Sequence, residues 1–153
     1  MTAPQRLGLL FNYDWDALAF DALSPPFAFD RAGFDLFSFP SNVRLAGFDL
    51  ERFAQRQARR GQARGWAGVL SHHEQFGALA AAMVAERLGL PGTPVNAVLA
   101  CQHKLHARRV LAQVCPQANL GFAALEAEYG GAIPEGLSYP AYVKQIGRAS
   151  CRE

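Results

Sequence analysis

Short apolar runs alternate with amphipathic segments along roughly the first ninety residues of the chain. Arg6–Tyr13 is an apolar run of the kind that forms a buried strand, and Asp14 can cap a helix over Trp15–Leu23. Phe34–Phe39 alternates weakly between apolar and polar positions, which predicts a second strand that Pro40 ends. These segments predict a strand, a helix and a second strand in succession.

A charged amphipathic segment, Leu50–Arg60, predicts a surface helix, and the glycine-rich stretch Gly61–Gly65 is expected to end it. The compact apolar run Trp66–Leu70 predicts a third strand. It is followed by a nearly apolar helix over Phe76–Leu88, which Gly89 and the proline behind it terminate. This alternation predicts an α/β fold, in which an open parallel sheet carries helices on its faces.

The remainder of the chain has a different pattern. Val95–Val114 is rich in Ala, Leu and Val but carries more charge, which predicts a partly exposed helix or a pair of helices. Asn119–Leu125 and Tyr139–Lys144 are predicted strands, and Gly130–Gly131 is a predicted turn between them. These segments predict a second structural unit after the α/β part.

The composition narrows the class of protein. The chain has 153 residues, of which 50% are hydrophobic and 18% charged, so it is neither disordered nor collagen-like. Its net charge of +2 is too small to indicate nucleic acid or a membrane as a partner. No early apolar run has the length of a signal peptide or a membrane span, so a cytoplasmic location is expected. Three cysteines without CxxC spacing favour reduced thiols.

The last eight residues, Ile146–Glu153, match a widely used sequencing-adaptor sequence read in frame, so they are not expected to be part of the natural fold. Gln145 would then have a hybrid codon of which only the first base is native, and a proline codon shares that base. We therefore expect the natural chain to continue past Lys144. A clean read of the source DNA through these codons into a natural stop would contradict this expectation.

Several familiar catalytic and nucleotide-binding motifs are missing. The sequence has no GxGxxG, no GxxxxGK[ST] and no GxSxG motif. It therefore lacks the fingerprint of dinucleotide binding, the P-loop of nucleotide-binding proteins and the nucleophile motif of α/β-hydrolases. The four histidines, His72, His73, His103 and His106, lack the spacing of a metal site and are interpreted as surface or ligand-pocket residues. Glu74 follows a predicted strand, where α/β sheets meet ligands, although capping the next helix is its simpler role.

Lysine use is unusual. Of 15 basic residues only two are lysines, Lys104 and Lys144, and all the others are arginines. A lysine carries a compact charge that suits a phosphate oxygen, whereas arginine prefers a planar, two-pronged partner. The simpler interpretation of each is a solvated surface lysine.

Three segments in a fixed order carry a resemblance to a known family. Glu74–Gly77, then Glu86–Gly92 followed by His103–Lys104, and finally Tyr139–Lys144, whose sequence is Tyr-Pro-Ala-Tyr-Val-Lys, together resemble the front half of the ATP-grasp ligases. The resemblance implies a Rossmann-like pre-ATP-grasp domain over residues 1–92 and the incomplete beginning of an α+β ATP-grasp domain over 93–145. Residues 146–153 would be a non-native tail.

The resemblance also implies a chemistry. Family members use ATP and Mg²⁺ to phosphorylate a carboxylate, and an amine or thiol attacks the resulting acylphosphate. Lys104 and Lys144 fall on the positions that contact the ATP phosphates, with His103 in place of the usual aspartate, and Glu74 would face the substrate. The family's magnesium ligands and glycine-rich loop lie beyond Lys144. The parent protein is therefore expected to be a ligase, while this chain by itself is expected to be inactive.

The sequence bears on two other classes of protein. A stand-alone Rossmann-like module that binds a small ligand without catalysis explains the first ninety residues equally well, but it leaves Tyr139–Lys144 without a purpose. A receiver-type signalling domain is disfavoured because Trp66–Leu70 ends without the aspartate that would be phosphorylated. The expected partner is a small carboxylate, with no nucleic acid and no membrane. An unpaired strand edge at the tail would also favour a homodimer.

Overall fold

The computed structural model describes residues 3–23, 26–74, 76–125, 134 and 139–143. Its contacts separate two units, Met1–Val98 and Leu99–Glu153. The first unit contains, in chain order, β1 (Gln5–Leu10), the 3-10 helix η1 (Asp14–Asp16), α1 (Ala17–Ala22), β2 (Phe27–Ala32), the 3-10 helix η2 (Ser41–Gly47), α2 (Leu50–Arg64), β3 (Gly68–Leu70) and α3 (Phe76–Leu88). Helix α4 (Val95–Gln102) crosses the boundary, and α5 (Lys104–Val114) and the 3-10 helix η3 (Pro116–Ala118) follow.

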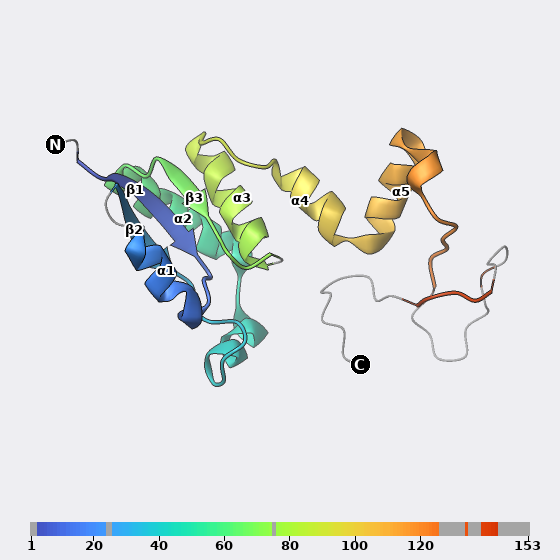
Figure 1. The fold of residues 1–153 in the computed structure, drawn as a ribbon, viewed down its shortest axis with the longest axis horizontal. Helices are drawn as coiled ribbons and strands as arrows, with labels where there is room; N and C mark the ends of the chain where they lie inside the picture. Colours follow the sequence, from blue (N-terminus) through green and yellow to red (C-terminus); the bar gives the residue numbers. More distant parts are fainter. Residues whose placement is uncertain (1–2, 24–25, 75, 126–133, 135–138, 144–153) are drawn as a thin grey trace. The chain divides into compact units, whose positions relative to one another are not determined.

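A parallel sheet organises the first unit. The described residues form three strands in the order β2-β1-β3, with β1 in the centre (Figure 1). Strand β1 pairs in parallel with both neighbours, and Leu7 lies opposite Phe29 of β2 and opposite Gly68 of β3. Leu9 and Leu10, which point to opposite faces of the sheet, are both fully buried, so the end of β1 is covered on both faces. The predicted α/β class with an open parallel sheet is confirmed.

The core of this unit is built around Phe11, the residue that follows β1. Its ring contacts those of Phe34, Phe48, Phe53 and Phe76, with centroid separations of 4.9 to 5.6 Å. Such edge-on and tilted aromatic contacts add to the energy of burial. Phe11 therefore joins the end of the central strand to α2, to α3 and to the long loop that contains η2.

Helix α2 is longer than the sequence predicted, because Gly61 lies inside it instead of ending it. A Cβ at Gly61 would overlap the ring of Trp66 and the side chain of Leu88, so glycine is needed here for close packing. The helix ends at Gly65, which adopts a left-handed conformation with φ of 64°. At its start, Asp49 caps the helix by accepting from the backbone N–H of Arg52.

The second strand was predicted in the wrong place. Phe34–Phe39 forms no strand, and β2 instead spans Phe27–Ala32, before Gly33. Gly33 has a φ of 103°, which turns the chain away from the sheet. Asp35 then accepts from the backbone N–H groups of Phe37 and Ser38, and this local turn competes with strand pairing.

The helix pair predicted over Val95–Val114 is confirmed as α4 and α5. His103 caps α5, since its Nδ1 accepts from the backbone N–H of His106 at 3.1 Å. The strands predicted over residues 119–125 and 139–144 are wrong as far as the described residues reach, because 119–125 and 139–143 form no strand. The predicted turn at Gly130–Gly131 and the residue Lys144 lie outside the described residues.

Burial differs between the two units. The described residues of the second unit include none that is buried, and apolar side chains such as Val114, Leu120 and Tyr142 are exposed. A structural unit of this kind contributes little hydrophobic stabilisation by itself. Within the described parts of both units, no helix is long and apolar enough to cross a membrane.

Candidate ligand-binding site

The strand order defines where a ligand would meet the sheet. From β1 the chain crosses to β2 on one side, and later elements return to β3 on the other side, so the topology switches direction between β1 and β3. In open α/β sheets, ligands bind outside the carboxyl ends of the strands at such a switch point. Here Leu9 pairs with Leu70, which places the loop after β1 beside the loop after β3.

Tyr13 and Glu74 connect these two loops. The Tyr13 hydroxyl donates to Glu74 Oε2 at 3.2 Å. Burial and the nearby negative charge of Glu74 raise the pKa of Tyr13, so the phenol keeps its proton. A backbone hydrogen bond lowers the pKa of Glu74 against the opposing effect of burial, and the hydrogen bond from Tyr13 lowers it further. Glu74, the residue predicted from sequence to face the substrate, is thus an ionised carboxylate at the sheet edge.

A second pair joins the same two loops. His72 Nδ1 lies 2.5 Å from Asp16 Oδ2, and the two residues are 56 positions apart in sequence. Asp16 occupies the N-cap position of α1 but makes no side-chain cap there, because its carboxylate is directed to His72. A carboxylate on one ring nitrogen orients an imidazole and leaves the other nitrogen available to a ligand.

His73, the next residue, is held differently. Its side chain is buried, and its Nδ1 accepts from the backbone N–H of Gly77 at the start of α3 at 3.3 Å. Burial lowers the pKa of His73, although the charges of Glu74 and Asp35 act in the opposite direction. His73 is therefore the side chain that caps α3, the role that sequence reasoning had offered to Glu74.

Aromatic rings line this edge. Tyr13 and Trp15 stack in parallel with centroids 4.5 Å apart, and Phe37 lies 5.4 Å from Tyr13 on the β2 side. Trp15 and Phe37 remain 66% and 62% exposed. Large aromatic side chains left this open beside polar groups are typical of a binding surface. We name the set Tyr13, Asp16, His72, His73 and Glu74 the edge cluster.

Sequence reasoning singled out the histidines and Glu74 but retained neither Tyr13 nor Asp16 as a site residue. A signal for both was present, because the polar and aromatic residues from 12 to 16 lie at the carboxyl end of the first predicted strand and directly after it. Under the switch-point rule, that position alone marks a candidate site.

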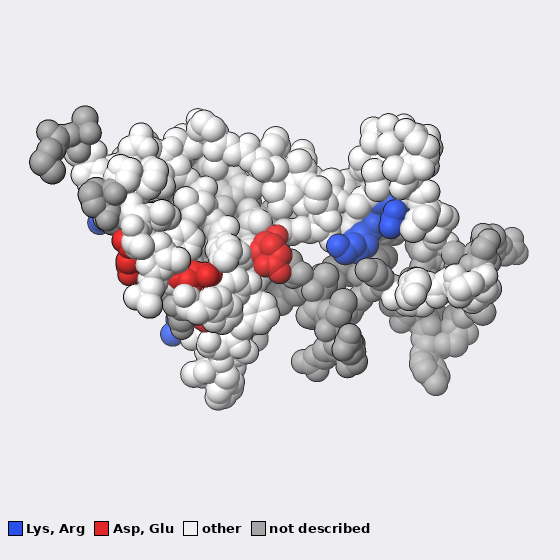
Figure 2. Space-filling view, in the orientation of Figure 1, with Lys and Arg blue, Asp and Glu red and all other residues white. Residues whose placement is uncertain are grey.

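A small cavity of about 170 Å³ lies next to the edge cluster, where β1 and β2 end. Asn12, Gly33 and Asp35 are among the residues that line it. Arg31 also lines it, and the guanidinium of Arg31 is paired with Asp21 at 2.8 Å. On the face drawn in Figure 2, acidic side chains form patches over α1 and over the start of α3. The carboxylates on this side of the sheet would attract a positively charged group of a ligand.

The lysines predicted to contact ATP are not brought together by the described residues. Lys104 is the first residue of α5 and is exposed, in the second unit, where Figure 2 shows basic side chains over the start of this helix. Lys144 lies outside the described residues. The rings of His103 and His106 are 6.4 Å apart, yet the described residues contain no group of three or more His, Cys, Asp or Glu side chains placed to hold a metal ion.

Comparison of the chain with protein-family models, with curated proteins and with solved structures finds no match. The edge cluster and its position in the sheet are therefore the basis for assigning a function.

Proposed function

We propose that the first unit is the substrate-binding part of an ATP-dependent ligase, which joins a carboxylic acid to an amine or a thiol through an acylphosphate. The observation that carries this proposal is the edge cluster. Tyr13 and Asp16 from the loop after β1 meet His72 and Glu74 from the loop after β3, at the point where a parallel α/β sheet binds ligands.

In the proposed reaction a carboxylate oxygen of the substrate attacks the γ-phosphorus of ATP, and ADP leaves. The amine or thiol then attacks the carbonyl carbon of the acylphosphate, and inorganic phosphate leaves. Phosphoryl transfer depends mainly on positioning and on neutralising charge. Lys104 is exposed at the start of α5, which suits contact with a phosphate oxygen. The described residues do not fit a magnesium site, so they contribute to binding and orientation.

The second candidate is a stand-alone module that binds a small ligand without catalysis. One observation favours it: every member of the edge cluster lies in the first unit, which has its own buried core. In this alternative the second unit would take no part in binding at the edge cluster.

The DNA beyond codon 144 tests the ligase directly. The ligase predicts a reading frame that continues into a glycine-rich loop and a distal Glu…Glu-x-Asn set. Protein made from that complete frame should release ADP when Mg²⁺, ATP, a carboxylic acid and an amine are supplied together. Lys104→Ala should reduce the release at least tenfold, while Arg109→Ala, an exposed control on the same helix, should leave it unchanged. A frame without these elements would contradict the ligase and favour the stand-alone module.

A further inference from the structure

We propose that Asp16 and His72 form a catalytic pair in the edge cluster, in which His72 Nε2 takes a proton from an attacking amine and Asp16 positions the ring. This inference rests on the proposed function, because a ligase of this kind needs a base for its nucleophile. Amines carry an extra proton near pH 7 and attack an acyl carbon only after losing it. The inference also selects the amine over the thiol as the class of nucleophile.

The hydrogen bond between the two residues fixes the tautomer of His72. Its Nδ1 lies 2.5 Å from Asp16 Oδ2, and a carboxylate can only accept a hydrogen bond. Nδ1 therefore carries the proton of the neutral imidazole, and the lone pair is on Nε2. The carboxylate of Asp16 is used for this contact, since it makes no side-chain hydrogen bond at the start of α1. Nε2 is thus the basic nitrogen of the ring.

The two side chains differ in exposure in the way that a base requires. The side chain of His72 is 58% exposed, whereas that of Asp16 is 16% exposed. Nδ1 faces Asp16, which leaves Nε2 as the ring nitrogen that a ligand can reach from solvent. A carboxylate behind an open imidazole also stabilises the imidazolium that forms when the base takes a proton. The pair therefore has the geometry of a carboxylate-supported base.

The other histidines are used differently. His73 is buried, and its Nδ1 accepts from a backbone N–H in the first turn of α3. His103 Nδ1 accepts in the same way from the backbone of His106. In their neutral forms these two rings have no second lone pair to offer a substrate. Among the described residues, the ion pair that includes a histidine is that of Asp16 and His72, so the exposed His106 serves as a comparison without a carboxylate.

The groups around the pair favour an amine as the nucleophile. Glu74 Oε2 accepts from the Tyr13 hydroxyl at 3.2 Å, and the charge of Glu74 also acts on His72. The rings of Tyr13 and Phe20, at 5.8 and 6.4 Å from that of His72, flank the imidazole. Two carboxylates, those of Asp16 and Glu74, thus lie near one basic ring at the sheet edge. They attract an ammonium group and oppose a thiolate.

The proton and the electron pairs move in a simple order. His72 Nε2 takes one proton from the ammonium group, which gives the nitrogen its lone pair. The nitrogen then bonds to the acyl carbon, and the bond between that carbon and the phosphate oxygen breaks. Phosphate leaves with the electron pair and takes up the second proton of the nitrogen. The imidazolium, stabilised by Asp16, returns the first proton to water.

The first test measures the reactivity of each histidine in the 153-residue chain. Diethyl pyrocarbonate acylates an imidazole nitrogen that has an accessible lone pair, and tandem mass spectrometry of peptides gives the rate for each ring. His72 is expected to react severalfold faster than His106 and His73. Asp16→Asn should remove this difference and leave His106 unchanged, because an amide can donate to Nδ1 and move the ring proton to Nε2. The thermal midpoint of unfolding checks that Asp16→Asn remains folded.

The second test supplies the acylphosphate directly, so that no ATP is needed. The 153-residue chain is mixed with acetyl phosphate and either glycinamide or hydroxylamine, which is neutral at pH 7 and needs no base. In His72→Asn the amide nitrogen can take the place of Nδ1 and donate to Asp16, but the base is missing. This variant should lower the protein-dependent rate with glycinamide about tenfold or more and leave the rate with hydroxylamine unchanged. His106→Asn, the matched control, should change neither rate.

The outcomes separate this inference from the proposed function. If His72 reacts no faster than His106, or if His72→Asn leaves the glycinamide rate unchanged, His72 is not the base, and the ligase still has its own test in the DNA beyond codon 144. If both tests succeed but that DNA lacks the ligase elements, the ligase is wrong and the pair remains a base for an amine.

Discussion

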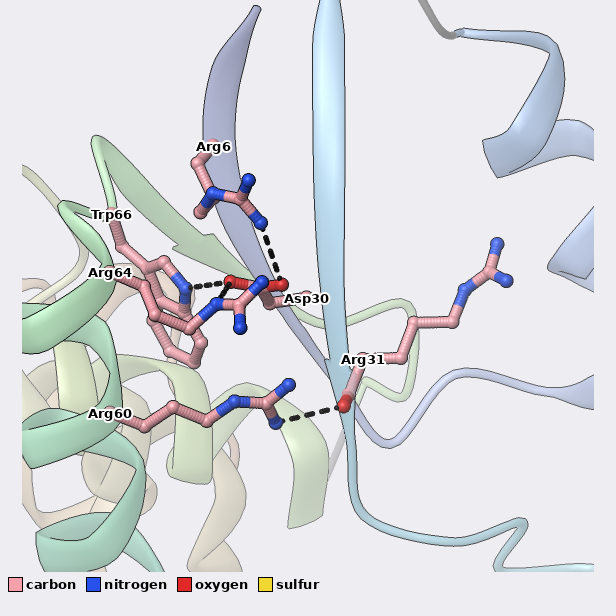
Figure 3. Close-up of polar contacts among 6 residues, drawn as sticks. All are labelled: Arg6, Asp30, Arg31, Arg60, Arg64 and Trp66. Carbon is pink, nitrogen blue, oxygen red and sulfur yellow. Dashed lines mark hydrogen bonds and ion pairs between the residues drawn. The ribbon is translucent and has the colours of Figure 1, made fainter.

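Trp66 Nε1 donates a hydrogen bond of 2.7 Å to Asp30 Oδ2, which joins the segment between α2 and β3 to strand β2 (Figure 3). Arg64 Nε donates to the same oxygen at 2.6 Å, and Arg6 Nη1 donates to Oδ1 at 3.1 Å. Burial raises the pKa of Asp30, but the hydrogen bonds from Trp66 and Arg64 together bring it below its ordinary value. The buried carboxylate therefore stays ionised and holds three segments together.

Asp30→Asn is expected to lower the free energy of unfolding by about 2–3 kcal/mol, because an amide N–H₂ would face an arginine and the charge that both arginines neutralise would be lost. This value is below that of a fully buried pair, since the side chains of Arg6 and Arg64 are 39% and 46% exposed. Urea unfolding followed by circular dichroism measures the change.

Asp21→Asn is the matched control for this substitution. Asp21 pairs with Arg31 at 2.8 Å, but its side chain is 62% exposed. An exposed pair contributes about 0–1 kcal/mol. A loss as large for Asp21→Asn as for Asp30→Asn would contradict the view that burial sets the strength of the Asp30 contacts.

Gly61→Ala is expected to destabilise the protein by about 1–3 kcal/mol, because the new methyl group would overlap Trp66 and Leu88. In an exposed helix interior the same change stabilises by about 0.5–1 kcal/mol, so the predicted sign is reversed. Gly47→Ala is the control, because nothing lies within 4 Å of a Cβ at that position. Thermal unfolding of the two variants checks the prediction, and an unchanged or raised midpoint for Gly61→Ala would count against it.

Gly61 also shows what a single sequence can predict. The helix over Phe76–Leu88 was predicted with its observed bounds, because its pattern and its terminating glycine are local features. Gly61 was expected to end α2, since its need for close packing depends on Trp66 and Leu88, which a local pattern does not contain. Phe27–Ala32 was missed as a strand for a related reason: its pairing with β1 is a long-range interaction, and the local alternation at Phe34–Phe39 was the stronger signal.

The residues of the candidate site also fall into those that local sequence predicts and those that depend on long-range contacts. Glu74 was found because a position after a strand is local information. The contact between Asp16 and His72 depends on β1 and β3 being neighbours, and these strands pair residues such as Leu7 and Gly68, which are 61 positions apart in sequence (68 − 7). The capping role of His73 could not be separated from that of Glu74 without the geometry at Gly77.

ATP is expected to bind the 153-residue chain very weakly or undetectably, even with Mg²⁺ present. Lys104 is exposed, and the described residues gather no metal ligands. One charge-assisted contact contributes about 1.5–3 kcal/mol, far below the roughly 8 kcal/mol of a micromolar complex. Isothermal titration calorimetry with and without Mg²⁺ measures this, and tight magnesium-dependent binding would contradict it.

The stability of the chain is expected to fall as the pH drops below about 6.5, the ordinary pKa of histidine, because of His73. Its pKa in the folded protein is lowered by burial, so in this range the unfolded chain binds a proton that the folded chain does not. Stability then rises with pH, with a slope of up to about 1.4 kcal/mol per pH unit for one such group. The loss is complete once the pH lies below the folded pKa of His73.

Urea unfolding between pH 5 and pH 8, a window of about three units around that ordinary value, measures this dependence. Glu74 and Asp30 do not produce it, because their pKa values are lowered from ranges that already lie below this window. His73→Asn keeps the acceptor for Gly77 but removes the titrating ring, so it should flatten the pH dependence while retaining most of the stability at pH 8. An equally steep dependence in His73→Asn would show that another group causes it.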